Sequence, residues 1–329
     1  MFVSTVTSDP CENAKIYYFG WLEPSLRSAN MKRMLALGTL VVVGGFSIGL
    51  GSQQLNPAAV EATQIEAVKG NLYVIGGGGP GTDEFSGGNV GVFVGSDGVT
   101  LVDTKLGGWG QLLLDRIGTV TDKPVIRIIN THTHGDHVGS NSFFPASVDI
   151  IVHENTQANM QRMENFDGDN AHGLADQTYT DTLTIGTGSD QIDLHHFGAG
   201  HTNGDTFVVY PALRVLQTGD MFPWRDAPFL DRNNGGSGLA LPDTLERLIS
   251  TVTDIDTVVP GHIPVTTPGE LRQFQRFTYD LREAVRNARD TGKTVEQAVA
   301  SIDLTSQYHG YNTNRMAAAI RVIYEELGQ

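Results

Sequence analysis

Three histidines and an aspartate lie within six consecutive positions of segment 131–140, which reads THTHGDHVGS. Imidazole nitrogens and carboxylate oxygens are the donors that a borderline divalent ion such as zinc prefers. In an extended segment the rings of His132 and His134 point to the same side, and Asp136 and His137 follow shortly after. Four donors this close together cannot converge on one tetrahedral ion without strain. The spacing therefore predicts two pairs of ligands and two metal ions.

Three more candidate ligands, His201, Asp220 and His262, follow the ends of predicted strands further along the chain. A glycine directly precedes each of them, which allows the backbone to turn sharply beside a metal ion. Any one of the three alone is typical of an ordinary loop, but together with the HxHxDH segment they indicate a shared metal site. Asp103 ends another predicted strand, where it could cap a turn or accept the N–H of a metal-binding imidazole.

The elements that must position these residues are predicted from β-branched runs and from glycine and aspartate turn signals. An antiparallel meander is expected at 72–75, 89–94 and 99–102. A buried strand at 125–129 leads into the HxHxDH segment. Further strands are expected at 149–152, 183–185, 191–196, 206–210 and 214–217, and helices at 111–120 and 154–163. The tail is predicted to be helical, with capping boxes at Thr267–Glu270 and Thr294–Gln297 and an apolar stripe near the C-terminus.

Three longer loops, at 76–88, 165–176 and 221–238, are candidates for the walls of a substrate pocket. The first reads GGGGPGTDEFSGG and precedes a strand instead of a helix, which argues against a phosphate-binding loop. It is expected to be a hairpin flap or a plain exposed loop. The third loop contains Trp224 and Arg225, our candidate pocket residues. Arg225 could bind a substrate carboxylate or form an ordinary surface salt bridge.

The composition limits the partners that the protein can have. The chain has 329 residues and a formal net charge of −15 at pH 7, so it repels phosphate backbones, and we expect no nucleic-acid partner. The single cysteine, Cys11, excludes an internal disulfide and a cysteine framework for an iron–sulfur cluster or structural zinc. Any metal must therefore be bound by histidines and carboxylates.

An uncharged apolar run covers residues 34–50 and follows Lys32 and Arg33. This pattern is typical of a signal peptide, so we expect export to the periplasm or the extracellular space. The alternative is an uncleaved anchor, although the run is short for a membrane span; only then would the protein contact a membrane. The expected organisation is an N-terminal extension with the signal at 1–51, a linker at 52–66, a catalytic domain at 67–265 and a helical C-terminal extension packed on it at 266–329.

With Asp103, the HxHxDH segment and the three later candidates in this order, the chain resembles the metallo-β-lactamase-fold hydrolase superfamily over roughly residues 66–265. The resemblance implies an α/β fold, the four-layer αββα sandwich, with metals at one rim. It implies that His132, His134 and His201 bind a first metal ion, that Asp136, His137 and His262 bind a second, and that Asp220 bridges both. Asp103 would not bind a metal ion itself but would orient a ligand through a hydrogen bond.

The residue at position 220 distinguishes groups within this superfamily. The best-known zinc β-lactamases carry Cys or Ser there, whereas lactone, thioester and phosphoester hydrolases carry Asp. Asp220 therefore makes the chain similar to the Asp-bridged dinuclear members, such as glyoxalase II and lactonase relatives. This departure argues against lactamase activity without excluding it.

These observations together predict an exported dinuclear zinc hydrolase of a small ester, thioester, lactone or lactam, with iron or manganese as alternative metals. Two ions about 3.5–4 Å apart generate hydroxide from water at neutral pH, and Asp136 could orient this hydroxide and accept a proton. One alternative is a mononuclear iron enzyme that oxidises persulfides, as some members of the superfamily do. The other is a metal-containing binding protein without catalysis. The pattern predicts no particular oligomeric state.

Overall fold

The structure, a computed structural model, describes residues 55–328. The predicted signal peptide and Cys11 lie outside these residues. Within the described part of the chain, no helix has both the length and the apolar character needed to cross a membrane.

The first sheet contains seven strands that lie side by side in chain order. They are β1 (Ile65–Lys69), β2 (Leu72–Ile75), β3 (Val90–Val94), β4 (Val99–Val102), β5 (Val125–Ile129), β6 (Asp149–His153) and β7 (Gln177–Tyr179). The pairs from β1 to β4 are antiparallel and include the predicted meander, whereas the pairs from β4 to β7 are parallel. Parallel neighbours need crossover connections, which contain α2 (Gly110–Ile117), α3 (Gly135–Val138) and α4 (Glu154–Met160).

The second sheet has five strands in the order β12-β11-β10-β9-β8. They are β8 (Thr182–Ile185), β9 (Ile192–His195), β10 (Phe207–Tyr210), β11 (Val215–Gly219) and β12 (Thr257–Pro260). All neighbours are antiparallel except β11 and β12, which run parallel. The helix α5 (Leu241–Thr251) lies in the connection between these two strands.

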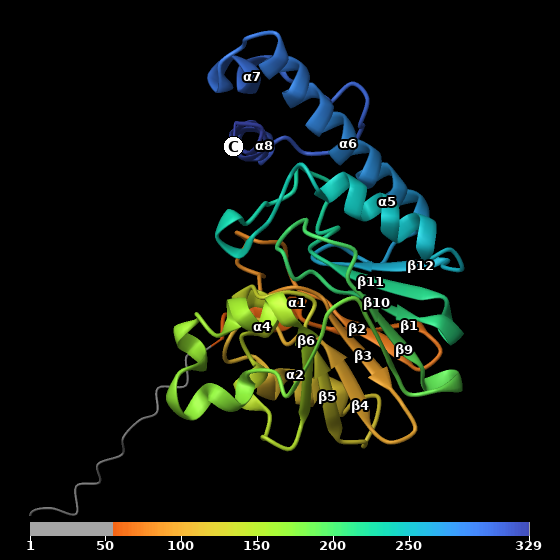
Figure 1. Ribbon diagram of the computed structural model, residues 1–329. Coiled ribbons are helices and arrows are strands. Elements are labelled where there is room, and N and C mark those ends of the chain that lie inside the picture. Colours follow the sequence, from red (N-terminus) through yellow and green to blue (C-terminus); the bar gives the residue numbers. More distant parts are fainter. Residues whose placement is uncertain (1–54, 329) are drawn as a thin grey trace, which may run out of the picture. The chain divides into compact units, whose positions relative to one another are not determined.

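Three apolar clusters show how the sheets and helices are layered. One lies between the sheets and combines residues such as Leu72 of β2 with Leu194 of β9. The second covers the outer face of the first sheet and includes Leu113 of α2 and Met160 of α4. The third joins the outer face of the second sheet to α5 and the C-terminal helices, and it includes Phe274. Because strand side chains alternate between faces, these clusters produce the predicted four-layer αββα sandwich (Figure 1).

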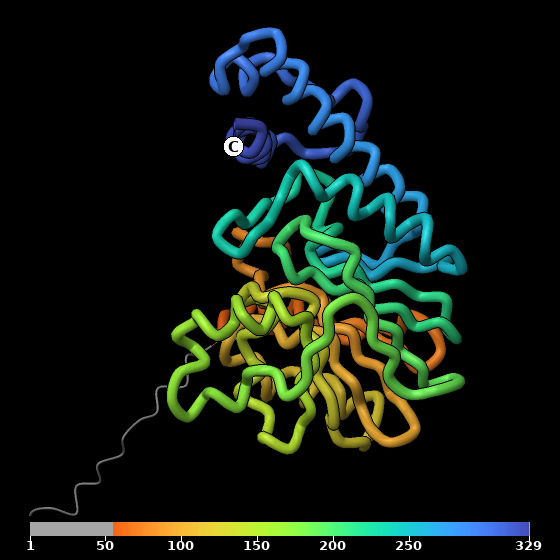
Figure 2. Tube along the Cα trace, in the orientation of Figure 1, coloured from red at the N-terminus to blue at the C-terminus, as the bar shows by residue number. Residues whose placement is uncertain are grey.

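The C-terminal region is helical and packs on the side of α5, away from α2 and α4 (Figures 1 and 2). It consists of α6 (Pro268–Asp290), α7 (Val295–Ser301) and α8 (Met316–Glu326). The face of α6 that the apolar spacing predicts is buried, with exposures of at most 2% for Leu271, Phe274, Phe277, Leu281 and Val285. The amphipathic pattern therefore identifies correctly the side of α6 that enters the core.

The linker expected at 52–66 needs a correction, because it contains the helix α1 (Pro57–Ala62) and the first residues of β1. Asn56 Oδ1 accepts the backbone N–H of Ala58, and Pro57 is the first helical residue. An Asn cap followed by proline is a helix start signal. Since β1 pairs with β2, this segment joins the first sheet.

One of the two predicted capping boxes is also absent. Thr267 precedes α6, but its side chain makes no capping hydrogen bond. Glu270 instead accepts a hydrogen bond from Arg225 Nε at 3.0 Å. The box formed by Thr294 and Gln297 is present at the start of α7, as predicted.

His153 joins the end of β6 to the start of α4 and is buried. Its Nε2–H donates to the carbonyl of Thr180 at 2.8 Å, and its Nδ1 accepts the N–H of Asn155 at 3.2 Å, so the ring is neutral. Burial, together with the His196 ring stacked 3.9 Å away, lowers the pKa of His153 from 6.5 to about 4. Below pH 6.5 the unfolded chain binds a proton that the folded chain does not, so stability falls as the pH drops towards 4.

The unfolding free energy of the wild-type protein should fall between about pH 7.5 and about pH 5. We expect this fall to be smaller by about 1 kcal/mol in His153→Asn. Asparagine stays neutral and can still cap α4. Urea unfolding of both proteins at both pH values measures the difference, and contributions from histidines that both proteins carry largely cancel. An equal loss in the two proteins would contradict the prediction.

Candidate metal centre

Loops at one edge of the two sheets bring the seven predicted ligands together. In the first sheet β4 and β5 run parallel, and in the second β11 and β12 do so, so the residues that follow each pair lie side by side. The HxHxDH segment follows β5, while Asp220 and His262 follow β11 and β12. The ligand atoms fall into two groups, each within 4.8 Å, made of His132, His134, His201 and Asp220, and of Asp136, His137 and His262.

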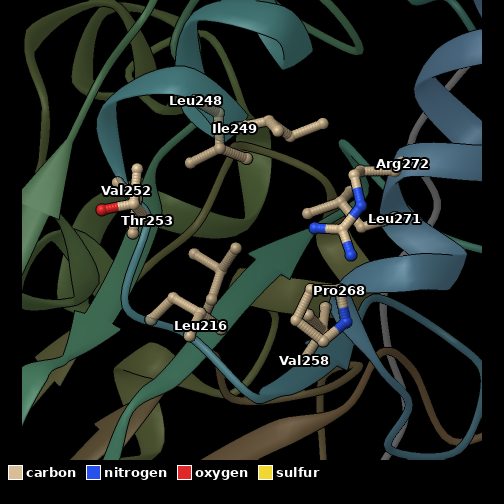
Figure 3. A pocket seen from close by; sticks show the side chains of 10 residues that line it. Leu216, Leu248, Ile249, Val252, Thr253, Val258, Pro268, Leu271 and Arg272 are labelled. Atoms are coloured by element: carbon tan, nitrogen blue, oxygen red, sulfur yellow. The ribbon is translucent and has the colours of Figure 1, made fainter.

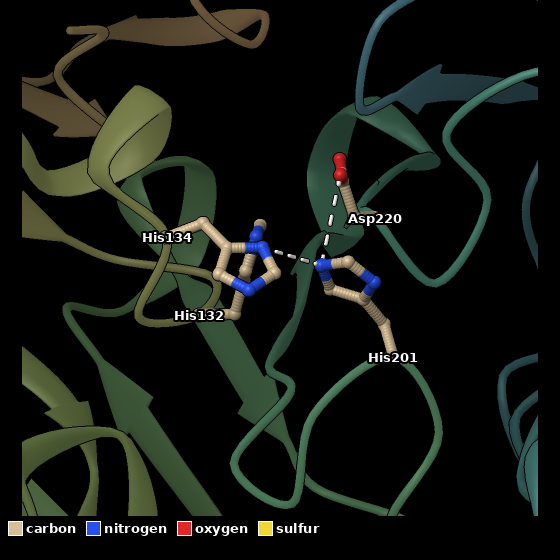
Figure 4. Close-up of side chains that lie close together, drawn as sticks. All are labelled: His132, His134, His201 and Asp220. Carbon is tan, nitrogen blue, oxygen red and sulfur yellow. Dashed lines mark hydrogen bonds and ion pairs between the residues drawn. The ribbon is translucent and has the colours of Figure 1, made fainter. Parts of the chain in front are cut away.

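The first group contains three imidazoles and one carboxylate (Figure 4). His201 Nε2 lies 2.8 Å from His134 Nδ1 and 3.7 Å from Asp220 Oδ2. The ring of His132 completes the group, with its centroid 4.6 Å from that of His201. Such a set of nitrogen and oxygen donors suits a catalytic zinc ion, which typically has three protein ligands and an open position.

The second group lies next to the first, and Asp220 lies between them. His262 Nε2 is 3.4 Å from both Asp136 Oδ2 and His137 Nε2. Asp220 Oδ2 is 3.2 Å from His262 Nε2, and Asp220 Oδ1 is 3.3 Å from His137 Nε2. Asp220 therefore contacts members of both groups, which is the position that a bridging ligand needs.

Two glycines permit this close approach. A Cβ at residue 261 would fall on Asp220 Oδ1. Gly219 has φ +50°, a left-handed conformation that favours glycine, and a Cβ there would overlap Thr131. Gly219 is thus needed for its backbone conformation and for the space beside Thr131, and Gly261 for the space beside Asp220.

Asp103 organises the histidines that follow β5. His137 Nδ1–H donates to Asp103 Oδ2 at 2.8 Å, and Thr131 Oγ1 donates to the same oxygen at 2.7 Å. Because the Thr131 hydroxyl hydrogen is used in this way, His132 Nδ1–H must be the donor in its 3.0 Å contact with Thr131 Oγ1. Asp103 therefore directs Nε2 of both His132 and His137 towards the centre, the second of the two roles considered for it.

Two hydrogen bonds to residues that are not predicted ligands orient His134 and His201, the remaining histidines of the first group. His134 Nε2–H donates to Asp231 Oδ2 at 2.7 Å, and His201 Nδ1–H donates to the carbonyl of Phe229 at 2.7 Å. Neutral rings with these tautomers carry no hydrogen on His134 Nδ1 or His201 Nε2, which face each other at 2.8 Å. Two lone pairs at this distance repel each other unless a proton or a metal ion binds to them.

Unpaired atoms provide a further test of whether metal ions fit. His132 Nε2 and Asp220 Oδ1 are buried and have no hydrogen-bond partner among the described residues. A buried polar atom without a partner costs free energy, and a divalent ion would satisfy both atoms. The residues therefore fit two metal ions, although their assignment as ligands stays a prediction.

The charges in the centre shift the pKa values of its members strongly. Burial alone would lower the pKa of His137, but the carboxylates of Asp136, Asp220 and Asp103 outweigh it and raise that pKa well above its ordinary value. Burial and the neighbouring His137 lower the pKa of His132 well below its usual range. Protons and metal ions therefore compete for His137, and metal affinity should fall as the pH falls.

The family model described as the metallo-beta-lactamase superfamily matches residues 83–262, which is more than half of the chain. The chain belongs to the metallo-beta-lactamase superfamily. The superfamily binds metal ions, typically zinc, and the two groups of ligand atoms lie where this chain could bind them. Its members include many hydrolases, so a metal-dependent hydrolase is supported in broad terms.

Individual members of the superfamily are similar to parts of this chain. The metallo-beta-lactamase IND-1 of Chryseobacterium indologenes is 25% identical over 156 residues, which are 46% of this chain and 61% of that protein. The metallo-beta-lactamase from Pontibacter korlensis has a TM-score of 0.57 at 19% identity, over 66% of this chain and 98% of its own. DIM-1 metallo-beta-lactamase has a TM-score of 0.56 at 19% identity, over 66% and 97%. At such low identity, the structural matches establish the fold.

Aromatic side chains from the predicted pocket loops lie next to the candidate metal centre. Trp224 stacks on His262 with ring centroids 5.6 Å apart, and Phe85 of the loop 76–88 approaches the same ring at 5.9 Å. Phe229 is 45% exposed and lies 5.6 Å from the ring of His134. Arg225 pairs with Glu270 on the surface instead, which is the second of the two roles considered for it.

Lys105 was not singled out from the sequence, yet it is fully buried beside the centre. Its Nζ donates to the carbonyl of Gly88 at 2.9 Å, and a Cβ at residue 88 would overlap the ring of His137. Burial lowers the pKa of Lys105 to about 7, against the opposing effect of Asp136 and Asp103. Lys105 thus holds the end of the loop 76–88 against the ring of His137.

Asp231 is the main partner of a predicted ligand that the sequence did not reveal, because Asp-Arg-Asn-Asn-Gly-Gly at 231–236 is typical of an ordinary turn. It does cap such a turn, but its second oxygen accepts from His134. We expect Asp231→Asn to weaken metal affinity by about tenfold, the lower end of the range for such partners, since the amide keeps an acceptor but loses the charge. Titration with a competing chelator measures this.

A matched control is Asp193→Asn, on β9, whose carboxylate accepts hydrogen bonds from Thr184 and Gln191 and belongs to neither group of ligand atoms. It removes the same charge away from the metal centre and should leave metal affinity unchanged. Equal affinities for the two variants would show that Asp231 does not support the ligand.

His195 and His196, which precede His201 in the chain, make contacts outside the candidate metal centre. His196 Nδ1–H donates to the carbonyl of Asp205 and its ring stacks on His153, while His195 stacks on Phe197. Neither belongs to the two groups of ligand atoms. Both rings therefore pack against neighbouring aromatic rings outside the centre.

Proposed function

We propose that the protein is an exported dinuclear zinc hydrolase that acts on a small ester, thioester, lactone or lactam. The observation that carries the proposal is the arrangement of two donor groups around Asp220, with facing ring nitrogens 2.8 Å apart. The family supports metal-dependent hydrolysis, and the names of its relatives support a carbonyl substrate. Export rests on the apolar run at 34–50.

When bound, two divalent ions would activate a water molecule and polarise the carbonyl oxygen next to the bond to be cleaved. Among the predicted ligands, Asp136 and His134 keep the most exposed side chains, 21% and 19%. The substrate therefore approaches from their side of the centre. Asp136 is suited to orient the attacking water and to accept its proton, since its carboxylate is both near His262 and open to solvent.

The surroundings of the centre favour a substrate with an apolar portion. Phe85, Trp224 and Phe229 supply aromatic surface next to the ligand rings. These side chains exclude water around the reacting bond and can bury an acyl chain or a ring. Asp220, in the place where the best-known zinc β-lactamases have Cys or Ser, makes a lactone or thioester the first choice and a lactam the last.

Elemental analysis of protein purified without added metal, combined with turnover of an ester, a thioester, a lactone and a lactam, tests the proposal. Two zinc ions per chain with hydrolysis would support it. One iron ion per chain with oxygen consumption in the presence of a persulfide would replace it with the dioxygenase alternative. Two bound metals without turnover of any substrate would favour a metal-containing binding protein.

A further inference from the structure

A hollow lies at the opposite end of β11 and β12 from the candidate metal centre. Asp220 and His262 follow the last residues of these strands, whereas Leu216 and Val258, near the first residues, border the hollow. Its volume is about 210 Å³. It is lined by Leu216, Leu248, Ile249, Val252, Thr253, Ile255, Val258, Pro268, Leu271 and Arg272 (Figure 3).

The inner wall of this cavity belongs to the protein core. Leu216, Leu248, Val258 and Leu271 are each at most 2% exposed. Protein interiors are closely packed, and an apolar cavity of about 150 Å³ is already large enough to bind benzene. An apolar ligand in this larger cavity would restore the contacts that these side chains lack.

Arg272 is the only charged residue in the lining. Its guanidinium lies on the α6 side of the cavity (Figure 3), and it has no hydrogen bond or ion pair with any residue in the described part of the chain. In contrast, Arg282 and Arg286 on the same helix pair with carboxylates. Arg272 is therefore available to an anionic group of a ligand.

The acidic residues next to the cavity do not compete for Arg272. Asp254 pairs with Arg214 at 3.0 Å, and Asp256 pairs with Lys69 at 2.8 Å. The first turn of α6, which contributes Pro268 and Leu271 to the lining, adds the partial positive charge of a helix N-terminus. The mouth of the cavity therefore favours a negative charge, although the protein as a whole is acidic.

We propose that this cavity binds a monocarboxylate with a medium-length alkyl chain. At about 30 Å³ per small group, the volume accommodates roughly six to eight carbons. The chain would lie among the aliphatic side chains, and the carboxylate would accept hydrogen bonds from the Arg272 guanidinium. This site is separate from the metal centre and does not depend on the proposed hydrolase activity.

Calorimetric titration of the metal-loaded protein with sodium octanoate, octan-1-ol and octylamine tests this proposal. We expect octanoate to bind saturably, one per chain, and octan-1-ol and octylamine to bind at least about tenfold more weakly. Arg272→Met should reduce octanoate affinity about tenfold, to near that of octan-1-ol. Arg276→Met, one turn further along α6 and outside the lining, is the matched control and should bind octanoate like the wild type.

A second variant, Val252→Phe, fills the cavity without changing the charge and should abolish octanoate binding, while a thermal melt confirms that it is folded. No saturable octanoate binding below about 10 mM would overturn the proposal. Octanoate binding that neither variant changes would also overturn it, because the carboxylate would then be binding elsewhere, such as at the metal centre. Binding lost in Val252→Phe but unchanged in Arg272→Met would overturn the assignment of a carboxylate.

Discussion

Asp220→Ala is expected to remove bound metal and hydrolytic activity together. Asp220 lies within 3.7 Å of His201, 3.3 Å of His137 and 3.2 Å of His262, so the change removes a donor from both groups at once. Loss of metal-assisted charge stabilisation amounts to several kcal/mol, and we expect turnover to fall on the order of 10³-fold or more. Metal content per chain and turnover of a lactone or thioester are measured on the same sample.

Two control variants test whether the loss of metal and activity is specific to the Asp220 carboxylate. Asp220→Asn keeps the shape but loses the charge, so it should retain more metal than Asp220→Ala while still losing activity. Asp193→Ala removes a carboxylate from the same sheet away from the centre and should have no effect on either quantity. An Asp220→Ala protein that keeps two metals per chain and full turnover would show that the bridging assignment is wrong.

Removal of the metal by a chelator is expected to abolish activity and to lower the melting temperature by roughly 8 °C. Metal that binds only the folded chain stabilises it by about 4 kcal/mol when its free concentration is a thousand times Kd. The centre without metal retains the unpaired His132 Nε2 and Asp220 Oδ1. The loss should occur at lower chelator concentrations as the pH falls, because the carboxylates around His137 raise its pKa and protons then compete with the metal.

The control for this experiment is the addition of metal back to the chelated protein. Zinc should restore both activity and melting temperature, whereas magnesium should restore neither, since it prefers oxygen ligands in octahedral geometry. A melting temperature that does not change on chelation would indicate that the metal contributes nothing to the folded state. Activity that survives complete removal of metal would reject the proposed chemistry.

Local sequence patterns predicted much of this fold because the same residues that form each element also carry its signal. β5 matches the predicted strand at both ends because Val-Ile-Arg-Ile-Ile is β-branched throughout most of its length. The face of α6 follows from apolar residues at helical spacing. The segment 52–66 was mistaken for a linker, since pairing of β1 with the next strand is a tertiary contact that its own short sequence does not encode.

The sequence by itself determined the seven candidate ligands, because metal-binding side chains at strand ends are unusual enough to be recognised from their types and spacing. The tertiary structure decided which residues hydrogen-bond to these side chains and which residues surround them. Asp231 and the Phe229 carbonyl become partners of His134 and His201 only when the loop after β11 folds back. Arg225 pairs with Glu270 only because α6 begins beside that loop. Such contacts join distant segments through geometry, and neither partner carries a local signal of the other.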